Sequence, residues 1–330
     1  SQVKTAVVGV GHLGSLHARI YSRLPQAELV GVYDIDSERA AECAARYHVR
    51  AFSNLEETAR SAEAASLAVP TDSHYQVGKM LLNQGLHLLV EKPVTEREEH
   101  AEELVQIANG KGLVLAVGHV ERFNPALVAA AEHISNPLFV ESERLAPFNP
   151  RGTEVPVVLD LMIHDIDIVL SLIRRPVTEV KAMGVPVFTN SVDIASARLS
   201  FEGGAVANVA ASRVSIKKSR KMRFFSTDSY ISVDMLKHSA LAYRKRPGAE
   251  IPLERGTAGI PDMLSLVERK KLVPDKKREP LAVELADFLA CVTSGKKPVV
   301  SGADGLQALQ VAERILNAID RSLASSGLKN

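Results

Sequence analysis

Short apolar runs alternate with helical patterns over the first 120 residues of the chain. The runs predict strands at Val3 to Val8, Leu29 to Tyr33, Ala65 to Val69, His87 to Val90 and Leu113 to Val117. The spacing of apolar positions predicts helices at Ser15 to Leu24, Ser37 to Tyr47, His74 to Asn83 and Glu96 to Asn109. Strands alternating with helices of this length indicate a parallel sheet, whose two covered faces explain strands that are apolar throughout.

After about residue 120, strand candidates follow one another with turn signals between them. The expected strands are Leu138 to Leu145, Val177 to Met183, Ser191 to Phe201, Ala205 to Val214, Arg223 to Ser226, Tyr230 to Val233 and Ala240 to Tyr243. The expected helices are Pro125 to Ile134, Val158 to Ile173, Leu281 to Thr293 and Gly302 to Ala324. Gly203-Gly204 predicts a hairpin turn, and the lysine-rich stretch from Arg269 to Arg278 is interpreted as a mobile surface loop. This order favours an α+β domain, in which helices cover one face of a mostly antiparallel sheet.

Length and composition narrow the class of protein. A chain of 330 residues has room for two domains of ordinary size. Its 40 Lys and Arg against 39 Asp and Glu leave a formal net charge of +1, so no large field attracts nucleic acid or an anionic membrane. The absence of Trp argues against surfaces that bind bases or sugars by broad aromatic stacking.

Signals of cellular location are few. Cys43 and Cys291 cannot form a disulfide framework and indicate ordinary reduced thiols. No basic segment followed by an apolar run stands near the N-terminus, and no stretch approaches the roughly 18 apolar residues of a membrane helix. We therefore expect a cytoplasmic protein that binds neither nucleic acid nor a membrane.

The stretch Gly9-Val10-Gly11-His12-Leu13-Gly14 follows the first predicted strand and opens a helix. In such a loop the first glycine allows a tight turn, the second lets the backbone approach a pyrophosphate, and the third lets helix and strand pack closely. Asp34 ends the next strand 20 residues after Gly14, where a carboxylate binds the adenosine 2′-hydroxyl and repels a 2′-phosphate. The pattern predicts a site for NAD rather than NADP, with a ligand-free glycine turn as the alternative. Arg39 could receive a 2′-phosphate but is interpreted as a surface helix residue.

Two later segments end strands at the same edge of the predicted sheet. Val69-Pro70-Thr71 closes one strand, and Glu91-Lys92-Pro93 follows another. Because ligands of open parallel sheets bind outside the carboxyl ends of the strands, Lys92 is placed to reach a nicotinamide and a substrate. An ordinary surface Lys-Pro turn is the alternative.

The predicted helix Val158 to Ile173 is largely apolar but has a polar stripe. Asp160, His164, Asp167 and Ser171 share one face at helical spacing. Buried carboxylates are costly unless they are paired or face a polar cavity, so the stripe is expected to face a pocket. Metal binding lacks an evident third ligand, and a structural Asp–His pair is a second interpretation. A catalytic pair, in which Asp160 holds or charges His164 as a proton acceptor, fits best with a nearby nicotinamide.

This combination of motifs resembles the Gfo/Idh/MocA family of NAD(P)-dependent sugar and cyclitol oxidoreductases. The resemblance covers nearly the whole chain and rests on Gly9 to Gly14, Asp34, Pro70 with His74, Glu91-Lys92-Pro93, the helix with Asp160 and His164, and the long final helix. It implies a Rossmann domain with a doubly wound parallel sheet at residues 1–120. It also implies an α+β domain for substrate binding and oligomerisation at residues 121–330. Val158-Leu159 stand where the family often has a glycine pair.

The resemblance also implies roles for individual residues. Lys92, Asp160 and His164 would form the catalytic set. The cofactor would be held by Gly9, Gly11, His12, Leu13, Gly14, Asp34, Pro70, Thr71, His74, Glu91 and Lys92. Within the family, Gly118 to Pro125 and Asp160 to Asp165 look like the branch that oxidises the C3 hydroxyl of UDP-N-acetylglucosamine. No metal is implied.

Substrate contacts and competing functions complete the expectations. Arg122, Asn124 and Arg151 are candidate sugar-nucleotide contacts, since guanidinium groups suit phosphate and amides suit hydroxyls, but each could equally be a salt bridge or a cap. One alternative function is a dehydrogenase or reductase of a free sugar or cyclitol. Another is a non-catalytic NAD-binding regulator, against which the complete catalytic set argues.

Two surface features of the second domain have open interpretations. A basic cluster could approach a diphosphate or form a solvated strand end, and the second is favoured: Lys217, Lys218, Arg220 and Lys221. The predicted sheet leaves one face without helices, which a homodimer or homotetramer would bury.

Overall fold

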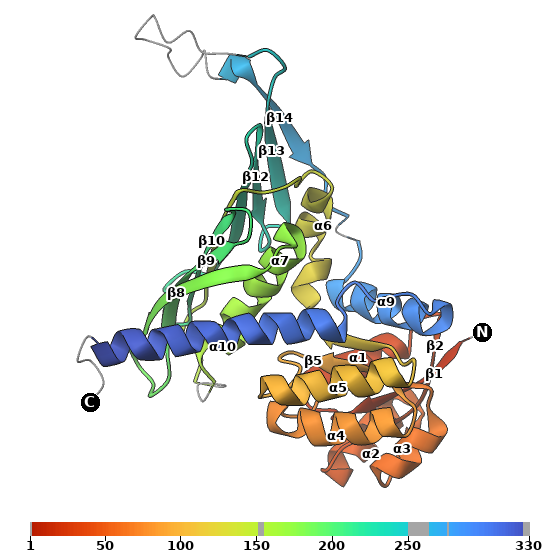
Figure 1. Ribbon diagram of the computed structural model, residues 1–330. Helices are drawn as coiled ribbons and strands as arrows, with labels where there is room; N and C mark the ends of the chain where they lie inside the picture. The colour runs from red at the N-terminus through yellow and green to blue at the C-terminus, as the bar shows by residue number, and fades with distance from the viewer. Residues whose placement is uncertain (1, 151–154, 250–263, 276, 326–330) are drawn as a thin grey trace, which may run out of the picture. The chain divides into compact units, whose positions relative to one another are not determined.

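The computed structural model describes residues 2–150, 155–249, 264–275 and 277–325 (Figure 1). Its contacts divide the chain into two compact units. Unit 1 comprises residues 1–123 and 278–310, and unit 2 comprises residues 124–277 and 311–330. The sequence division at residue 120 differs mainly in one segment, because residues 278–310 pack within unit 1.

Unit 1 contains a six-stranded parallel sheet with strand order β3-β2-β1-β4-β5-β6. Its strands are β1 (Val3–Val8), β2 (Ala27–Tyr33), β3 (Arg50–Ala51), β4 (Ala64–Leu67), β5 (His87–Glu91) and β6 (Leu115–Gly118). The strand order reverses between β1 and β4, and ligands of open α/β sheets bind outside the carboxyl ends of the strands at such a switch point. The predicted doubly wound sheet is confirmed, with β3 as an additional short edge strand.

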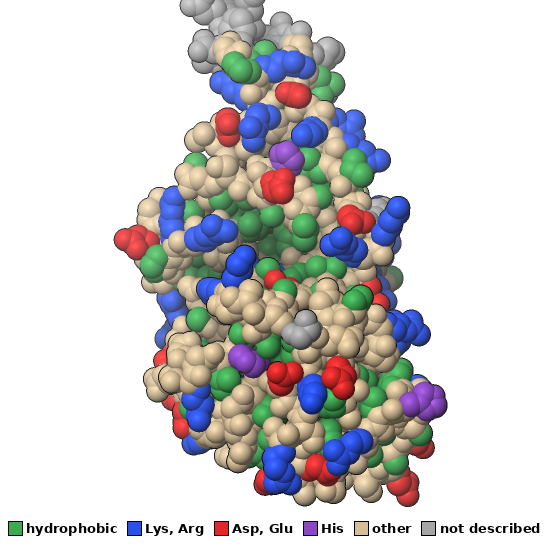
Figure 2. Space-filling model, turned by 90° about the vertical axis from the view of Figure 1, so that its right-hand side faces the viewer, with side chains coloured by type: hydrophobic (Ala, Val, Ile, Leu, Met, Phe, Trp, Pro, Cys, Tyr) green, Lys and Arg blue, Asp and Glu red, His purple; other side chains and the backbone are tan. Residues whose placement is uncertain are grey.

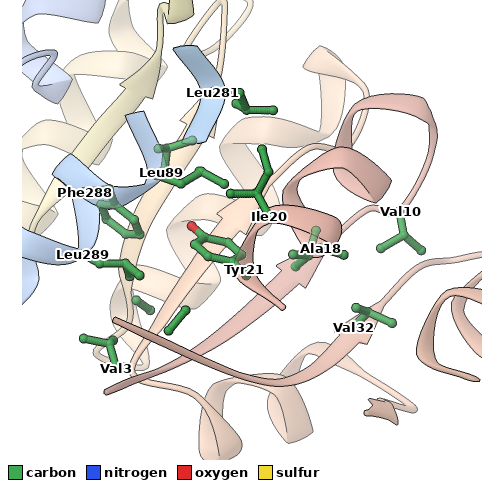
Figure 3. Close-up of a cluster of buried hydrophobic side chains, with 14 of the residues drawn as sticks. Val3, Val10, Ala18, Ile20, Tyr21, Val32, Leu89, Leu281, Phe288 and Leu289 are labelled. Carbon is green, nitrogen blue, oxygen red and sulfur yellow. The ribbon is translucent and has the colours of Figure 1, made fainter. Parts of the chain in front are cut away.

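Helices cover both faces of this sheet, as the continuously apolar strands require. They are α1 (His12–Tyr21), α2 (Ser37–Tyr47), α3 (Leu55–Ser61), α4 (Thr71–Asn83), α5 (Glu98–Gly110), the short 3-10 helix η1 (Val120–Phe123) and α9 (Pro280–Ser294). On one face, Ile20 and Tyr21 of α1 pack with Phe288 and Leu289 of α9 (Figure 3). This apolar contact explains why residues 278–310 belong to unit 1.

The opposite face of the sheet has its own apolar cluster. Leu81 and Leu82 of α4 and Leu104 of α5 are fully buried against Leu67 and Val90 of the sheet. Two separate layers of side chains therefore fix the sheet from both sides and make the carboxyl edge a rigid platform for loops.

Unit 2 contains an eight-stranded sheet with strand order β14-β13-β12-β11-β7-β10-β9-β8. Its strands are β7 (Phe139–Leu145), β8 (Val177–Val185), β9 (Ile194–Phe201), β10 (Val206–Ser212), β11 (Ser219–Phe225), β12 (Ser229–Asp234), β13 (Ser239–Lys245) and β14 (Val267–Leu272). Neighbouring strands are antiparallel except for the parallel pair of β7 and β10. The predicted mostly antiparallel sheet is confirmed.

Helices of unit 2 lie along one face of its sheet (Figure 1). They are α6 (Pro125–Ala131), the π-helix η2 (Val158–Met162), α7 (Ile163–Ile173) and the part of α10 (Gly302–Ser325) from Val311 onward. On the strands, side chains that are buried under these helices alternate with exposed ones, as in β9, where Ala195 is buried and Ser196 is exposed.

Two expectations for loops of unit 2 have opposite outcomes. Gly203 and Gly204 form the predicted turn between β9 and β10, with φ angles of 82° and 89° that favour glycine. The interpretation of Arg269 to Arg278 as a loop is wrong for its first part, because residues up to Leu272 form the edge strand β14. Exposed charged side chains suit an edge strand, since they oppose pairing with another chain, while Leu272 is buried.

The surface carries charges of both signs. On the face drawn in Figure 2, Lys and Arg side chains lie interspersed with Asp and Glu side chains. Within the described ranges, no helix is long and apolar enough to cross a membrane.

Candidate active site

The glycine loop after β1 has the backbone geometry of a phosphate-binding turn. Gly9 has a φ of 85°, and a Cβ on it would lie 2.7 Å from the carbonyl oxygen of Ala68. A Cβ on Gly14 would overlap the carbonyl oxygen of Gly9, so α1 can approach the loop only with glycine there. Gly11 is different, because nothing lies within 4 Å of a Cβ built on it. Packing does not require glycine at position 11, so its bare backbone fits the predicted approach of a pyrophosphate.

The amino end of α1 fits the same ligand. Gly11 is the N-cap and has no side chain to bond the first amides, and the first turn contains no acidic residue. The N–H groups of this turn, which includes the exposed His12 and Leu13, can therefore face a phosphate.

Asp34 lies at the end of β2, where its buried carboxylate joins the glycine loop to the start of α2. Its Oδ2 accepts a hydrogen bond from the N–H of Val10 at 2.8 Å, and its Oδ1 accepts one from the N–H of Asp36 at 2.9 Å. Arg39 donates to Oδ1 of Asp34 at 3.3 Å and lies 3.2 Å from Oδ2 of Asp36. Two carboxylates thus neutralise Arg39, which weakens its ability to hold a 2′-phosphate.

The loops after β4 and β5 are tied together by His74. Pro70 is the N-cap of α4 and Thr71 is its first residue. The buried ring of His74 places Nδ1 2.9 Å from the carbonyl oxygen of Pro93 and Nε2 2.9 Å from that of Val69. Burial lowers the pKa of His74 although both carbonyl oxygens favour its charged form. This geometry braces the Lys92 loop, and the predicted contact of His74 with the cofactor stays a prediction.

Glu91 ends a chain of buried hydrogen bonds that starts in α1. Nε2 of His17 lies 2.9 Å from Oε1 of Glu91, and Nδ1 of His17 lies 2.9 Å from Oγ of Ser66. The hydroxyl of Tyr21 lies 2.8 Å from the same Oγ. A Cβ on Gly118 would lie 2.7 Å from the carboxylate of Glu91, so the end of β6 also shapes this position. The network fixes Glu91 and therefore the backbone that carries Lys92.

Lys92 is half-buried at the carboxyl end of β5, at the same sheet edge as the glycine loop. His119 lies close by after β6, where burial together with the charges of Lys92 and Arg122 lowers its pKa to about 3. Its imidazole is therefore neutral at physiological pH. Arg122 also donates to the carbonyl oxygen of Val299 at 3.0 Å. The structure thus brings Lys92, His119 and Arg122 together in unit 1.

The other candidate substrate contacts have different outcomes. Asn124 is buried and caps α6, where its Oδ1 accepts from the N–H of Ala126 at 3.1 Å and its Nδ2 donates to the carbonyl oxygen of Met235 at 3.1 Å. Both the oxygen and the nitrogen of its amide are therefore hydrogen-bonded to the backbone of unit 2. Arg151 lies outside the described residues.

Asp160 and His164 lie in unit 2, on two helical segments rather than the single α-helix that the sequence predicts. Residues Val158–Met162 form a π-helix, and the N–H of Ile163 donates to the carbonyl oxygen of Val158 five residues earlier. Both side chains are half-buried, whereas Asp167 is buried and Ser171 bonds back to the carbonyl oxygen of Ile168. The predicted four-residue stripe on one α-helical face is therefore wrong in its first turn. π-helical turns occur frequently at functional sites.

Asp165 supports this segment from behind. Its Oδ1 accepts from Nε and Nη2 of Arg144 at 3.0 and 2.6 Å, and its Oδ2 accepts from Oγ of Ser142 at 2.5 Å. Asp165 and Arg144 are both buried, so this pair anchors α7 to β7 beside His164.

A cavity of about 530 Å³ lies beside Asp160 within unit 2. The described residues that line it are Arg144, Leu145, Ala146, Pro147, Phe148, Asn149, Pro150, Asp160, Leu161, Arg213, Lys218 and Arg220. Of the four stripe residues that the sequence predicts to face a pocket, Asp160 lines this cavity, whereas His164, Asp167 and Ser171 are not among its lining residues. Lys218 and Arg220 belong to its wall, whereas Lys221 lies on the other face of β11, beside Arg223 and Glu141.

The sequence missed several residues of this region. His17, Ser66 and Tyr21 come from separate elements, and no local spacing relates them to Glu91. His119 does carry a sequence signal, because it closely follows the end of the predicted strand that comes after the Lys92 strand. Within the described ranges, no group of three or more His, Cys, Asp and Glu side chains could hold a metal ion.

Comparisons with known proteins find matches to one family in both units. Residues 3–119 match the model of the Gfo/Idh/MocA oxidoreductases with an NAD-binding Rossmann fold, and residues 139–232 match the model of the C-terminal domain of the same proteins. The UDP-N-acetylglucosamine 3-dehydrogenase of Acidithiobacillus ferrooxidans is 38% identical over 97% of this chain and 98% of its own length. A solved structure of that enzyme from the same organism has a TM-score of 0.87 and 36% identity, covering 97% of this chain and 99% of its own. The scyllo-inositol 2-dehydrogenase (NAD(+)) of Bacillus subtilis is 26% identical over 96% of this chain and 94% of its own length.

Proposed function

The chain belongs to the Gfo/Idh/MocA family of oxidoreductases, and on this premise we propose that it oxidises the C3 hydroxyl of UDP-N-acetylglucosamine with NAD. The observation that carries the proposal is the complete catalytic set in a chain that resembles a UDP-N-acetylglucosamine 3-dehydrogenase over nearly its whole length. Lys92 belongs to unit 1, and Asp160 and His164 belong to unit 2. Their assembly around one substrate is part of the proposal.

The three residues divide the chemistry of alcohol oxidation between them. Oxidation of a secondary alcohol to a ketone removes one proton from the hydroxyl oxygen and one hydride from the carbon. His164 accepts the proton, and Lys92 donates a hydrogen bond that stabilises the negative charge developing on the oxygen. Asp160 orients the site and tunes its charge. When bound, NAD supplies a nicotinamide ring that can take up the hydride.

The preference for NAD over NADP rests on Asp34 and Arg39. The carboxylate of Asp34 is held at the end of β2 by the N–H groups of Val10 and Asp36. Its negative charge can accept a hydrogen bond from a ribose 2′-hydroxyl and would repel a 2′-phosphate. Arg39, the nearby cation, is already neutralised by Asp34 and Asp36.

Steady-state kinetics test this proposal directly. The purified chain is incubated with UDP-N-acetylglucosamine and NAD or NADP, and the appearance of the reduced cofactor is followed by its absorbance. We expect turnover with NAD that is lost in Lys92→Ala and His164→Asn, while both variants still bind NAD. Near wild-type turnover in either variant would falsify the catalytic assignment.

A second candidate is a dehydrogenase of a free sugar or cyclitol, which the similarity to an inositol dehydrogenase favours. A panel of UDP-sugars, free sugars and inositols separates the two candidates, because only one class should support turnover at low concentration. The non-catalytic alternative predicts bound NAD with no turnover on any alcohol, and the intact catalytic set argues against it.

We also propose that the chain forms a homodimer or homotetramer through the sheet of unit 2. On the face of the sheet without helices, Phe139, Phe225, Tyr230 and Tyr243 form a row across four strands, with neighbouring ring centroids 4.9 to 5.6 Å apart. Burying such a row between two copies would stabilise an assembly. Sedimentation of the wild type and of Phe225→Asp tests this idea, since a charge in the row should favour the monomer.

A further inference from the structure

The cavity beside Asp160 lies where two parallel strands of unit 2 end together. The N–H of Ala146, after β7, donates to the carbonyl oxygen of Ser212 at the end of β10 at 2.8 Å. The N–H of Ser215 returns a hydrogen bond to the carbonyl oxygen of Ala146 at 3.0 Å. The two loops that wall the cavity are therefore fixed to each other, and they hold a preformed site.

The charges in the cavity wall favour an anionic ligand. Four of the described side chains that line it are cationic, and Asp160 is the one acidic side chain among them. The buried Arg144 and Arg213 are neutralised by Asp165 and Asp193. Lys218 and Arg220 add two further cationic side chains to the same wall. Arg220 also stands directly opposite Arg144 in the β7–β11 ladder, so the two side chains extend from the same face of the sheet.

The rim of the cavity presents two aromatic side chains, Phe148 and Phe188. Phe148 lines the cavity and is 42% exposed, and Phe188, 69% exposed, packs edge-on against it at 5.5 Å. The loop of Phe188 is held by Asp193, whose Oδ2 accepts from the N–H groups of Val187, Phe188 and Thr189 at 2.7 to 3.0 Å. Phe148 therefore packs against a ring whose loop is held, and an exposed aromatic ring is suited to stacking against a flat ligand.

Asp193 connects this rim to the cavity wall. Its Oδ1 accepts from Nε of Arg213 at 2.7 Å, and Arg213 itself lines the cavity. Although burial opposes ionisation, the hydrogen bonds from Val187 and Arg213 hold the pKa of Asp193 well below its usual range. The rim is therefore held by a permanently ionised pair.

We propose that this cavity is the nucleoside diphosphate subsite of the substrate, in which Lys218 and Arg220 bind the diphosphate and Phe148 stacks on the base. The inference rests on the proposed function, because Asp160 in the same cavity marks the end occupied by the sugar. A volume of about 530 Å³ lies in the range of small-molecule sites. A free sugar or a cyclitol has neither phosphates to bind the cations nor a base to stack on the aromatic ring, so the subsite selects nucleotide sugars over both.

Calorimetric titration of the full chain with UDP tests the subsite without any turnover. Saturating NAD is present throughout, so that the dinucleotide site of unit 1 cannot take up the UDP. We expect Lys218→Ala and Arg220→Gln each to weaken UDP binding at least tenfold, and the weakening to shrink at high salt. Lys221→Ala is the matched control, because Lys221 lies on the same strand but on its other face, and its affinity should stay within twofold of wild type.

The aromatic contact has a separate readout. Phe148→Ala should weaken the binding of UDP roughly 5- to 100-fold, the range expected for loss of one stacked base. Binding of inorganic pyrophosphate to the same variant should stay within twofold, because pyrophosphate has no base. An equal loss for both ligands would show that Phe148 supports only the fold of the loop and would overturn its assignment.

The outcomes distinguish the subsite from the proposed function. If UDP binds with this pattern of variants but no UDP-sugar is oxidised, the subsite holds and the proposed reaction fails. If UDP-N-acetylglucosamine is oxidised while Lys218→Ala and Arg220→Gln leave its KM within twofold, the reaction holds and the subsite is refuted. If Arg220→Gln does not fold, Lys218→Ala decides the matter, since that side chain is exposed and its loss does not disturb packing.

Discussion

Replacing Asp165 by alanine should strongly destabilise unit 2, because it leaves a buried guanidinium without its carboxylate. Asp165 and Arg144 have exposed side-chain fractions of 0% and 3%, and Oδ1 of Asp165 accepts from two nitrogens of Arg144 at 3.0 and 2.6 Å. The hydroxyl of Ser142 also donates to this carboxylate at 2.5 Å. The variant removes all three bonds at once.

The expected cost follows from the burial of the pair. Removing one partner of a buried ion pair costs about 3–5 kcal/mol, since the remaining charge stays uncompensated. An exposed pair on the same strand provides the control: Arg223 lies 3.2 Å from Glu141, with both side chains more than 40% exposed. Loss of such a pair costs at most about 1 kcal/mol, so Glu141→Ala should change stability little.

Urea unfolding followed by circular dichroism measures both costs. With a slope of about 1–3 kcal/mol per molar urea, the transition of unit 2 in Asp165→Ala should move down by about 1 M or more. Glu141→Ala should move the midpoint of the same transition by only about a few tenths of 1 M urea. The double variant Asp165→Leu with Arg144→Met should recover much of the loss, because no buried charge remains. Equal midpoints for Asp165→Ala and Glu141→Ala would refute the reasoning.

Three further predictions follow from unit 1. Asp34→Ala should lower the ratio of kcat/KM for NAD to that for NADP at least tenfold, since the repelling charge is lost and Arg39 is released; an unchanged ratio contradicts the role of Asp34. Because burial lowers the pKa of His119 to about 3, the unfolded chain takes up a proton that the folded chain does not as the pH falls below about 6.5. Stability should therefore be lost on acidification with a slope of up to about 1.4 kcal/mol per pH unit, and urea titrations of His119→Gln should show a shallower slope than wild type. His17→Ala should lower the free energy of unfolding by about 3 kcal/mol, because Glu91 loses a buried partner, and His17→Gln, which keeps a donor, should lose less in the same assay.

The fold could be predicted from the sequence where the pattern of apolar positions is local and regular. The bounds of β1 and α2 agree with the expected ones, because six apolar-rich residues and a capped amphipathic run define them. Strand β3 was missed because it has only two residues, both exposed, and it is held only by pairing with β2. Strand β14 was missed because pairing with β13, rather than its charged sequence, makes it a strand.

The candidate site likewise has features that the sequence reveals and features that only the fold brings together. The glycine loop and Asp34 are set by spacing along one stretch of chain, so a sequence can reveal them. The contact of His17 with Glu91 joins residues 74 positions apart, and the wall of the cavity beside Asp160 combines four segments of unit 2. Such groupings depend on strand order and register, which apolar periodicity alone does not determine.

The π-helical turn before α7 bears on attempts to transplant this chemistry. A designer who copies the Asp160-x-x-x-His164 spacing onto an ideal α-helix of another scaffold would reproduce the count of residues but not the directions of the two side chains. The wide turn contributes one extra residue per hydrogen-bonded loop, whereas α7, which Asp165 anchors to β7, is an ordinary α-helix. A faithful graft therefore has to include the π turn and Arg144, which anchors α7 through Asp165, along with the side chains of Asp160 and His164.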